Sequence, residues 1–351
     1  CQFFPIENLS DASKIVGPAV LVGSQTSILV KSGWEGTLLA SGTIKLKRVK
    51  TFRPKRHTES AQIEVFNNLF MSIAEQMGFV LEKTAQSITI KERLDFSCAI
   101  FDKDGELVAN APHMPVHLGS MDSTVKSIIK NNSTLSPGDI FAINAPYNGG
   151  THLPDITIVN PIWNSEKSEI IFYTAARGHH TDIGGLTPGS MPCNSTDIHE
   201  EGIYIDNWKI VYDGVFREQE IKNKLLSGSY PARSPLTNIA DLKAQIASCK
   251  KGEKELLKIV DKYGLETVFR FQELVCQNAE NAVRDSIKTI KSTEIIYQMD
   301  NDLSGAVREI KIKLTPNKKN SSIEVDFNGT TMQLESNYNA PLPVTCLLYT
   351  S

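Results

Sequence analysis

A block of helical sequence between residues 218 and 291 separates two stretches of strand-like sequence. Two long amphipathic segments dominate this block, and Gly264 lies between them. Strand patterns precede the block at 139–144, 155–163 and 170–176, and they return from residue 294 onward. Strands followed by helices and then by strands favour an α+β fold with mixed sheets over regular βαβ winding.

The first 50 residues have a different character from the rest. Short alternating segments with glycine turns between 17 and 50 predict a small β unit. The polar, proline-containing stretch at 51–61 is typical of a linker. We therefore expect three parts: a β segment at 1–50, a linker at 51–61 and a larger domain at 62–351.

The larger domain begins with a predicted helix. From about 61 to 85, apolar residues such as Phe66, Phe70, Ile73 and Met77 recur at three- and four-residue steps. The segment DFSCAIFDKDGELVAN at 95–110 predicts a hairpin around an Asp-Gly turn, and a further helix is expected at 119–131.

Composition excludes several classes of partner. The 351 residues carry a net charge of −3 without a long basic block, so we expect neither nucleic acid nor a membrane surface as partner. The six cysteines, at 1, 98, 193, 249, 276 and 346, form no CxxC pair. Reduced thiols in a cytoplasmic protein are the simplest interpretation.

Two segments repeat a His-x-x-Asp pattern beside a Gly-Gly pair. The first contains His152 and Asp155, and the second contains His179 and Asp182. Both are predicted to be loops that border strands. Imidazole and carboxylate groups suit Mn²⁺, Fe²⁺ or Zn²⁺, so the two loops could share a metal site. From the residues alone, hydrogen-bonded surface pairs explain the pattern equally well.

Further polar residues lie near these motifs. His117 precedes the helix predicted at 119, and Glu201 stands next to a glycine. Arg93 and Arg177 could each hold a substrate carboxylate through a bidentate fork, or form an ordinary salt bridge. The sequence contains no nucleotide-binding glycine motif of the P-loop or dinucleotide type.

Several of these segments together resemble the hydantoinase B family. The resemblance runs from about 62 to 341 and rests on ITIKERLDFSCAIFDKDGELVANAPHMPVHLGSM, GDIFAINAPYNGGTHLPDITIVNPIW, ARGHHTDIGGLTPGSMP and FNGTTMQLESNYNAP. The stretch GPAVLVGSQTSILVKSGWEGTLLASGTIKL is similar to the closing β segment of the hydantoinase A family, the ATP-using partner. Both pieces on one chain resemble the fused arrangement of 5-oxoprolinases.

The resemblance implies an activity and a set of residues. It implies ATP-dependent hydrolysis of the cyclic amide 5-oxo-L-proline to L-glutamate, with ATP and Mg²⁺ bound in the hydantoinase A part. It also implies a divalent metal (Mn, Fe or Zn) on three ligands, with acid/base residues or ligand-supporting residues beside them. The implied ligands are His152, Asp155 and His179, and the supporting residues are His117, Asp182 and Glu201.

Alternative functions remain open at this stage. The same family includes subunits of N-methylhydantoinases and of acetone and acetophenone carboxylases, and a metal-binding scaffold without catalysis is a third reading. The expected partners are a hydantoinase A-like domain of the same full-length chain and further copies in a homo-oligomer. We also expect the B-type domain to be truncated at its C-terminus, with residues from about 345 to 351 foreign to it and a strand edge left unpaired.

Overall fold

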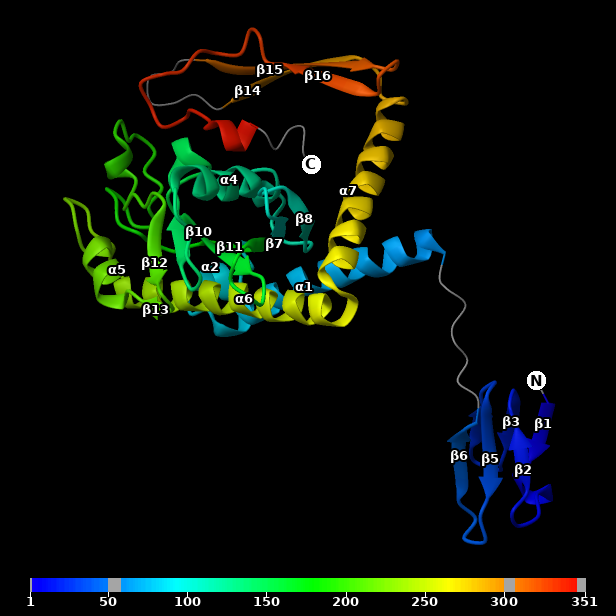
Figure 1. Ribbon diagram of the computed structural model, residues 1–351. Coiled ribbons are helices and arrows are strands. Elements are labelled where there is room, and N and C mark those ends of the chain that lie inside the picture. Colours follow the sequence, from blue (N-terminus) through cyan, green and yellow to red (C-terminus); the bar gives the residue numbers. More distant parts are fainter. Residues whose placement is uncertain (1, 50–57, 300–306, 346–351) are drawn as a thin grey trace. The chain divides into compact units, whose positions relative to one another are not determined.

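A computed structural model describes residues 2–49, 58–299 and 307–345. The chain divides into two compact units, residues 1–61 and residues 62–351 (Figure 1). Residues 51–57 of the predicted linker and residues 346–351 lie outside the described residues. Helix α1 already begins at Glu59, so the last residues assigned to the linker belong to its first turn.

The N-terminal unit consists of two small sheets. Its core contains Ile15, Ala19, Leu21 and Val30. One sheet has the order β1-β3-β4, with β1 parallel to β3, and the other is antiparallel with the order β2-β5-β6. The strands are β1 (Gln2–Pro5), β2 (Lys14–Val16), β3 (Ala19–Val22), β4 (Ser27–Val30), β5 (Trp34–Leu38) and β6 (Ile44–Arg48), with a short 3-10 helix η1 (Ile6–Asn8).

The larger unit is built around a seven-stranded antiparallel sheet. Its strand order is β13-β12-β9-β10-β11-β7-β8, so β10 and β11 lie near its centre. The strands are β7 (Phe96–Asp102), β8 (Leu107–Asn110), β9 (Ile140–Ile143), β10 (Asp155–Trp163), β11 (Ile170–His179), β12 (Trp208–Tyr212) and β13 (Val215–Phe216).

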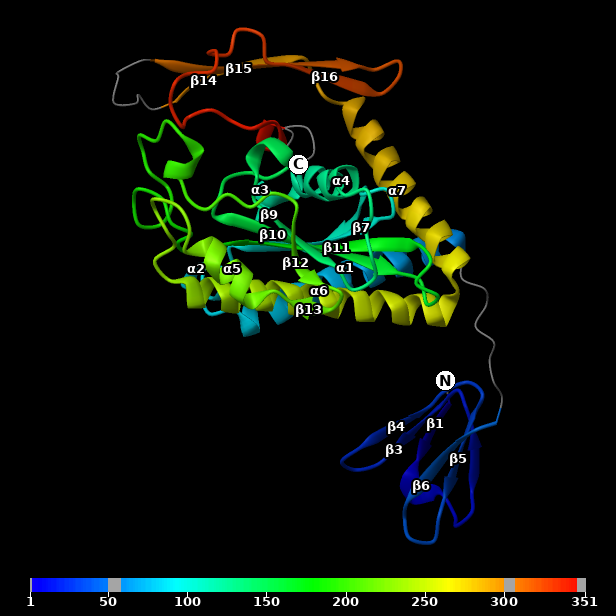
Figure 2. The ribbon, with the colours of Figure 1, turned by 60° about the vertical axis from the view of Figure 1, so that its left-hand side comes forward.

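Helices cover both faces of this sheet (Figures 1 and 2). Even-numbered strand residues such as Ile156 and Ile158 pack with α1 (Glu59–Thr84) and α6 (Pro235–Tyr263) in one apolar cluster. Odd-numbered residues such as Val159 and Ala175 pack under α4 (Met121–Asn131) in a second cluster. This coverage buries every residue of β10 except the last, Trp163, which is half-buried.

The predicted helical block is confirmed, and so is the α+β class. Gly264 separates α6 from the next helix, α7 (Leu265–Ile287), with φ +83°, a conformation that glycine adopts without strain. None of the helices in the described segments combines the length and apolarity needed to cross a bilayer. The remaining helices are α2 (Ile88–Lys91), α3 (Pro115–Leu118) and α5 (Glu218–Leu225), with 3-10 turns η2 (Pro146–Asn148) and η3 (Ile198–Glu200).

A separate three-stranded antiparallel sheet follows α7. Its order is β14-β15-β16, and α7 contacts β16. The strands are β14 (Thr293–Met299), β15 (Arg308–Asn317) and β16 (Ser322–Asp326).

Candidate functional site

Polar residues lie at one edge of the sheet, where β7 and β10 begin and β11 ends. Asp155 is the first residue of β10 and pairs directly with His179, the last residue of β11. The backbone N–H of His179 donates to the carbonyl of Asp95, which immediately precedes β7 (3.0 Å). Because side chains alternate across a strand, this register points all three side chains toward the face covered by α4. Asp155 and His179 are therefore strand residues: the strand predicted at 155–163 is confirmed, whereas β11 extends beyond its predicted end at 176 to include His179.

His152 does lie in a loop, and the Gly pair before it shapes that loop. Gly149 has φ +94°, and a Cβ there would come within 2.5 Å of the carbonyl oxygen of Ser123 on α4. A Cβ on Gly150 would come equally close (2.5 Å) to the carbonyl oxygen of Asn144. The two glycines thus let the loop turn tightly against α4 and return into β10.

His117 reaches the same place from the short helix α3. Its side chain is 1% exposed, and its Nδ1 lies 3.1 Å from the hydroxyl of Ser97. Its Nε2 faces the strand ends, 3.4 Å from Oδ2 of Asp155 and 3.8 Å from Oδ1 of Asp95. A hydrogen bond to one ring nitrogen fixes the ring and leaves the other nitrogen for the site.

The carboxylate of Asp155 is the centre of the cluster. Its Oδ2 accepts a hydrogen bond from the hydroxyl of Thr151 (2.8 Å) and lies 3.1 Å from Nδ1 of His152. Its Oδ1 lies 3.1 Å from Nδ1 of His179. Three imidazoles, those of His117, His152 and His179, therefore surround one carboxylate that is itself 1% exposed.

Electrostatics keep this carboxylate ionised. Burial opposes ionisation of Asp155, but hydrogen bonds from His117, His152 and His179 outweigh it and hold its pKa well below the ordinary value. For His179, burial alone would lower the pKa, yet the adjacent charge of Asp155, with that of Asp95, raises it. The site is thus centred on a buried carboxylate anion.

The donor set fits a divalent cation. His152, Asp155 and His179 each offer one ligand atom, and these atoms lie within 4.8 Å of one another. The two imidazoles differ in exposure: the side chain of His152 is 38% exposed, whereas that of His179 is 15% exposed. Two imidazole nitrogens and a carboxylate oxygen with one open side are typical of catalytic zinc and related metal sites.

Asp95 is a member of the cluster that the sequence did not reveal. Its Oδ2 lies 4.0 Å from Nδ1 of His179, and its side chain is 26% exposed. The residue before it, Leu94, has φ +56°, which is unusual for a branched side chain and re-aims the chain as it enters β7. Asp95 reaches the site because β7 pairs with β11, and a single sequence does not show which strands pair.

His179, and not His180, faces Asp155. His180 is fully buried on the opposite side, where its Nε2 contacts Gln245 (3.1 Å) and its Nδ1 contacts Asn238 (3.2 Å). Burial lowers the pKa of His180. Because successive side chains at the end of β11 point to opposite faces, His179 points toward the site and His180 points into the core.

Two of the predicted acid/base residues have other contacts. The carboxylate of Asp182 accepts hydrogen bonds from the backbone of Gly184 and Gly189 and from Arg233 at 2.8 Å. Burial opposes ionisation of Asp182, but these bonds lower its pKa. Glu201 accepts from the hydroxyl of Ser195 (2.9 Å). The structure does not bring Asp182 or Glu201 together with the imidazoles among the residues it describes, and both organise turns.

The two predicted substrate-binding arginines lie in opposite environments. Arg93 is exposed, two residues before Asp95. Arg177 is fully buried on β11, and its fork donates to the hydroxyls of Thr157, Ser120 and Thr124. Burial lowers the pKa of Arg177 to about 10. In this arrangement its donors face protein hydroxyls, so it does not present an open fork to a substrate.

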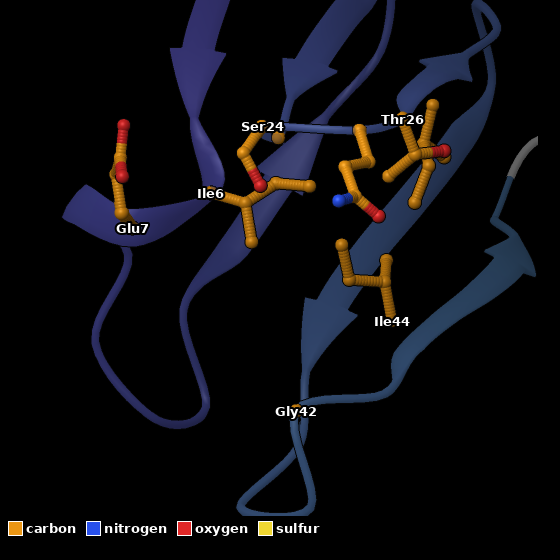
Figure 3. A pocket seen from close by; sticks show the side chains of 9 residues that line it. Ile6, Glu7, Ser24, Thr26, Gly42 and Ile44 are labelled. Carbon is orange, nitrogen blue, oxygen red and sulfur yellow. The ribbon is translucent and has the colours of Figure 1, made fainter.

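Two surface cavities are lined by other residues. One, of about 400 Å³, is in the N-terminal unit, and Figure 3 shows residues that line it, with Glu7 as the charged residue among them. The other, of about 500 Å³, is lined by residues that include His199, Tyr204 and Lys224. Neither cavity gathers the carboxylate and imidazole groups that converge on Asp155.

The chain is similar to several known proteins. The hydantoinase B/oxoprolinase family profile matches residues 59–350. A protein named 5-oxoprolinase 1 from Arabidopsis thaliana is 38% identical, over 97% of this chain and 29% of its own length. An uncharacterized protein of Methanocaldococcus jannaschii is 39% identical, over 81% of this chain and 49% of its own length. The crystal structure of an ATP-dependent caprolactamase from Pseudomonas jessenii superposes with a TM-score of 0.73 at 22% identity, over 83% of this chain and 50% of that one.

Proposed function

Because this chain belongs to the hydantoinase B/oxoprolinase family, we propose that it is the B-type catalytic region of an ATP-dependent 5-oxoprolinase. Its full-length form would open the cyclic amide of 5-oxo-L-proline to L-glutamate. The chain spans 29% of the length of the Arabidopsis relative that it matches, so this activity would belong to the longer protein. ATP and Mg²⁺ would bind in its hydantoinase A-like part.

The extent of the matches supports a 5-oxoprolinase over a separate B-type subunit. The relative named 5-oxoprolinase aligns with 97% of this chain, whereas the archaeal relative aligns with 81%. The N-terminal unit occupies residues 1–61, about the share by which the two differ. A hydantoinase A-like segment on the same chain favours the fused arrangement.

The observation that carries the proposal is the buried carboxylate of Asp155 among three imidazoles. We assign His152, Asp155 and His179 as ligands of a divalent metal, with the carboxylate of Asp95 within reach of the same region. Such a metal, when bound, polarises an activated carbonyl or lowers the pKa of a water molecule. Mn, Fe and Zn all suit this donor set.

The residues of the chain have distinct parts in this proposal. Asp155 stays ionised because its three imidazole neighbours outweigh the cost of its burial. His117 presents Nε2 toward Asp155 and Asp95, where it can hold or pass a proton at that atom. His152 is the most exposed of the three imidazoles, so it borders the side from which a substrate would approach.

The decisive experiment uses the full-length protein and follows glutamate formation from 5-oxoproline and ATP. We expect His152→Ala to abolish turnover, and Asp95→Asn to lower kcat by about two orders of magnitude, as loss of groups around a metal commonly does. Elemental analysis of the purified protein identifies the metal and should show its loss in His152→Ala.

A matched control is His199→Ala, which removes an exposed histidine outside the cluster. This variant should keep its metal. Normal turnover and metal content in His152→Ala would remove the site from the mechanism, and glutamate formation that needs no ATP would contradict the assignment to an ATP-dependent enzyme.

A further inference from the structure

The guanidinium of Arg177 poses a physical problem. It is fully buried, yet its hydrogen-bond partners within the described residues are three hydroxyls and no carboxylate. Burying a charge without a directly paired opposite charge is costly, so the position of Arg177 calls for a physical explanation.

Two of the three hydroxyls connect Arg177 to segments that carry site residues. Ser120 accepts from Nη1 of Arg177 (2.5 Å) and donates to the backbone carbonyl of His117 (3.2 Å). Thr124 accepts from Nη2 (2.8 Å) and donates to the carbonyl of Gly149 (2.5 Å), in the loop that leads to His152. One side chain is therefore linked to the main chain at α3 and at the loop of residues 149–154, which we call the glycine loop.

The third hydroxyl and the position of Arg177 itself complete the set. Nε donates to Thr157 (2.8 Å), which lies two residues after Asp155 on β10. Arg177 lies two residues before His179 on β11, and the register pairs it with Thr157. Because side chains two residues apart on a strand share a face, Arg177 lies directly behind the row formed by Asp155 and His179.

We propose that Arg177 is a positioning residue that fixes the spacing of the metal-binding side chains from behind. The inference rests on the proposed function, since it presupposes the metal site assigned above. Four segments, each carrying a member of the cluster, converge on one planar group: α3, the glycine loop, β10 and β11. A rigid fork with donors in several directions in one plane can hold three hydroxyls at fixed separations, which a lysine ammonium on a flexible stem does not do.

This role differs from the binding of a substrate carboxylate. The side chain of Arg177 is 0% exposed, and donors on Nε, Nη1 and Nη2 are all engaged. A substrate would have to displace hydroxyls that tie α4 to the sheet. Arg177 thus acts on the metal site through its neighbours, not by touching the reacting atoms.

The test is a titration of the metal-free full-length protein with Co²⁺, followed by its visible absorption spectrum. Arg177→Lys keeps the charge and loses the fork, and we expect it to weaken Co²⁺ binding by about 10- to 100-fold and to alter the ligand-field bands. Thr124→Val cuts one link and keeps the arginine, so it should weaken binding by a smaller factor and shift the same bands.

Thr174→Val is the matched control. Thr174 is a fully buried threonine on the same strand whose hydroxyl donates to the carbonyl of Cys249 on α6, at the opposite face of the sheet (3.2 Å). Thr174→Val, like Thr124→Val, removes a buried hydroxyl, but we expect this control variant to keep the Co²⁺ affinity and spectrum of the wild type. Should Arg177→Lys fail to fold, the comparison of the two threonine variants decides alone.

The outcomes separate this inference from the site on which it rests. Wild-type Co²⁺ affinity and spectrum in both Arg177→Lys and Thr124→Val, together with loss of binding in His152→Ala, would overturn the positioning role and leave the metal site standing. Undiminished binding in His152→Ala would overturn the metal site itself, and the positioning role with it.

Discussion

At the scale of single residues, the pairing of Asp155 with His179 predicts how metal binding depends on pH. Asp155 raises the pKa of His179, so this imidazole keeps its proton to a higher pH than an ordinary histidine. A metal must displace that proton, since only the neutral imidazole is a ligand. Affinity should therefore rise with pH by about tenfold per unit below the pKa of His179 and level off above it. Calorimetric titration with Zn²⁺ at several pH values measures this slope.

The sign of the effect is tested by Asp155→Asn. This change removes the charge that raises the pKa of His179, so the levelling-off should move to lower pH while the plateau affinity falls. Asp139→Asn is the control, because Asp139 is an equally buried carboxylate that pairs with Lys209 (2.7 Å) instead. An unchanged pH profile in Asp155→Asn would show that another group governs the proton release.

At the scale of secondary-structure elements, the contact of α6 with the sheet predicts a sharp effect of one methyl group. A Cβ on Gly252 would come within 2.4 Å of the sulfur of Met77 on α1 and 2.8 Å of Cγ2 of Thr174 on β11. In an exposed helix, Gly→Ala stabilises by about 1 kcal/mol. At this crowded crossing we expect Gly252→Ala to destabilise instead, by about 1–3 kcal/mol, as overpacking does. Urea unfolding measures the difference.

The control for this prediction is Lys254→Ala, an exposed position on the same helix. It should change the free energy of unfolding by less than about 0.5 kcal/mol. If Gly252→Ala were as stable as the wild type or more so, the tight contact between α6, α1 and β11 would not be a feature of the folded protein.

The sequence predicts most of the helices and strands, but it does not show which of them lie next to one another in the fold. The three- and four-residue periodicity of α1 and the break at Gly264 carry their own local signals. By contrast, β11 extends to His179, because its last residues pair with β10 and with the chain at Asp95. That pairing is non-local, so the predicted end at 176 came too early, and Asp95 was missed for the same reason. The burial of Arg177 was likewise invisible, since its partners come from α4 and β10.

At the scale of the whole molecule, the two units have separate cores. The apolar cluster of the N-terminal unit is formed by residues 4–44, and the two clusters of the larger unit are formed by residues 63–275. Removal of residues 1–57 should therefore shift the Tm of the larger unit by no more than about 2 °C, corresponding to less than about 1 kcal/mol. A large drop in Tm would mean that the N-terminal unit contributes to the stability of the other.

The sheet formed by β14, β15 and β16 leads to the last prediction. Its register pairs Ile295 with Ile312 and Tyr297 with Ile310, so one face of this antiparallel sheet is apolar. Its other face carries charged pairs such as Glu294 with Lys311 (2.9 Å). Ile295 is 50% exposed and Tyr297 is 65% exposed, and none of the three buried clusters in the described part of the chain includes an apolar residue of these strands. An apolar sheet face that exposes side chains to this extent is a surface for association.

We therefore expect the chain to bind the dye ANS at this sheet and to self-associate as its concentration rises. The double change Ile295→Thr with Tyr297→Thr puts β-branched residues, which favour strands, at both positions and removes the two exposed apolar side chains of this face. It should lower ANS fluorescence several-fold and shift sedimentation toward the monomer, while the Tm of the large unit stays within about 2 °C, because these side chains are exposed. Val283→Thr, which removes a comparably exposed apolar residue (59%) from α7, is the control and should change neither quantity. Undiminished ANS binding in the double variant would place the associating surface elsewhere on the molecule.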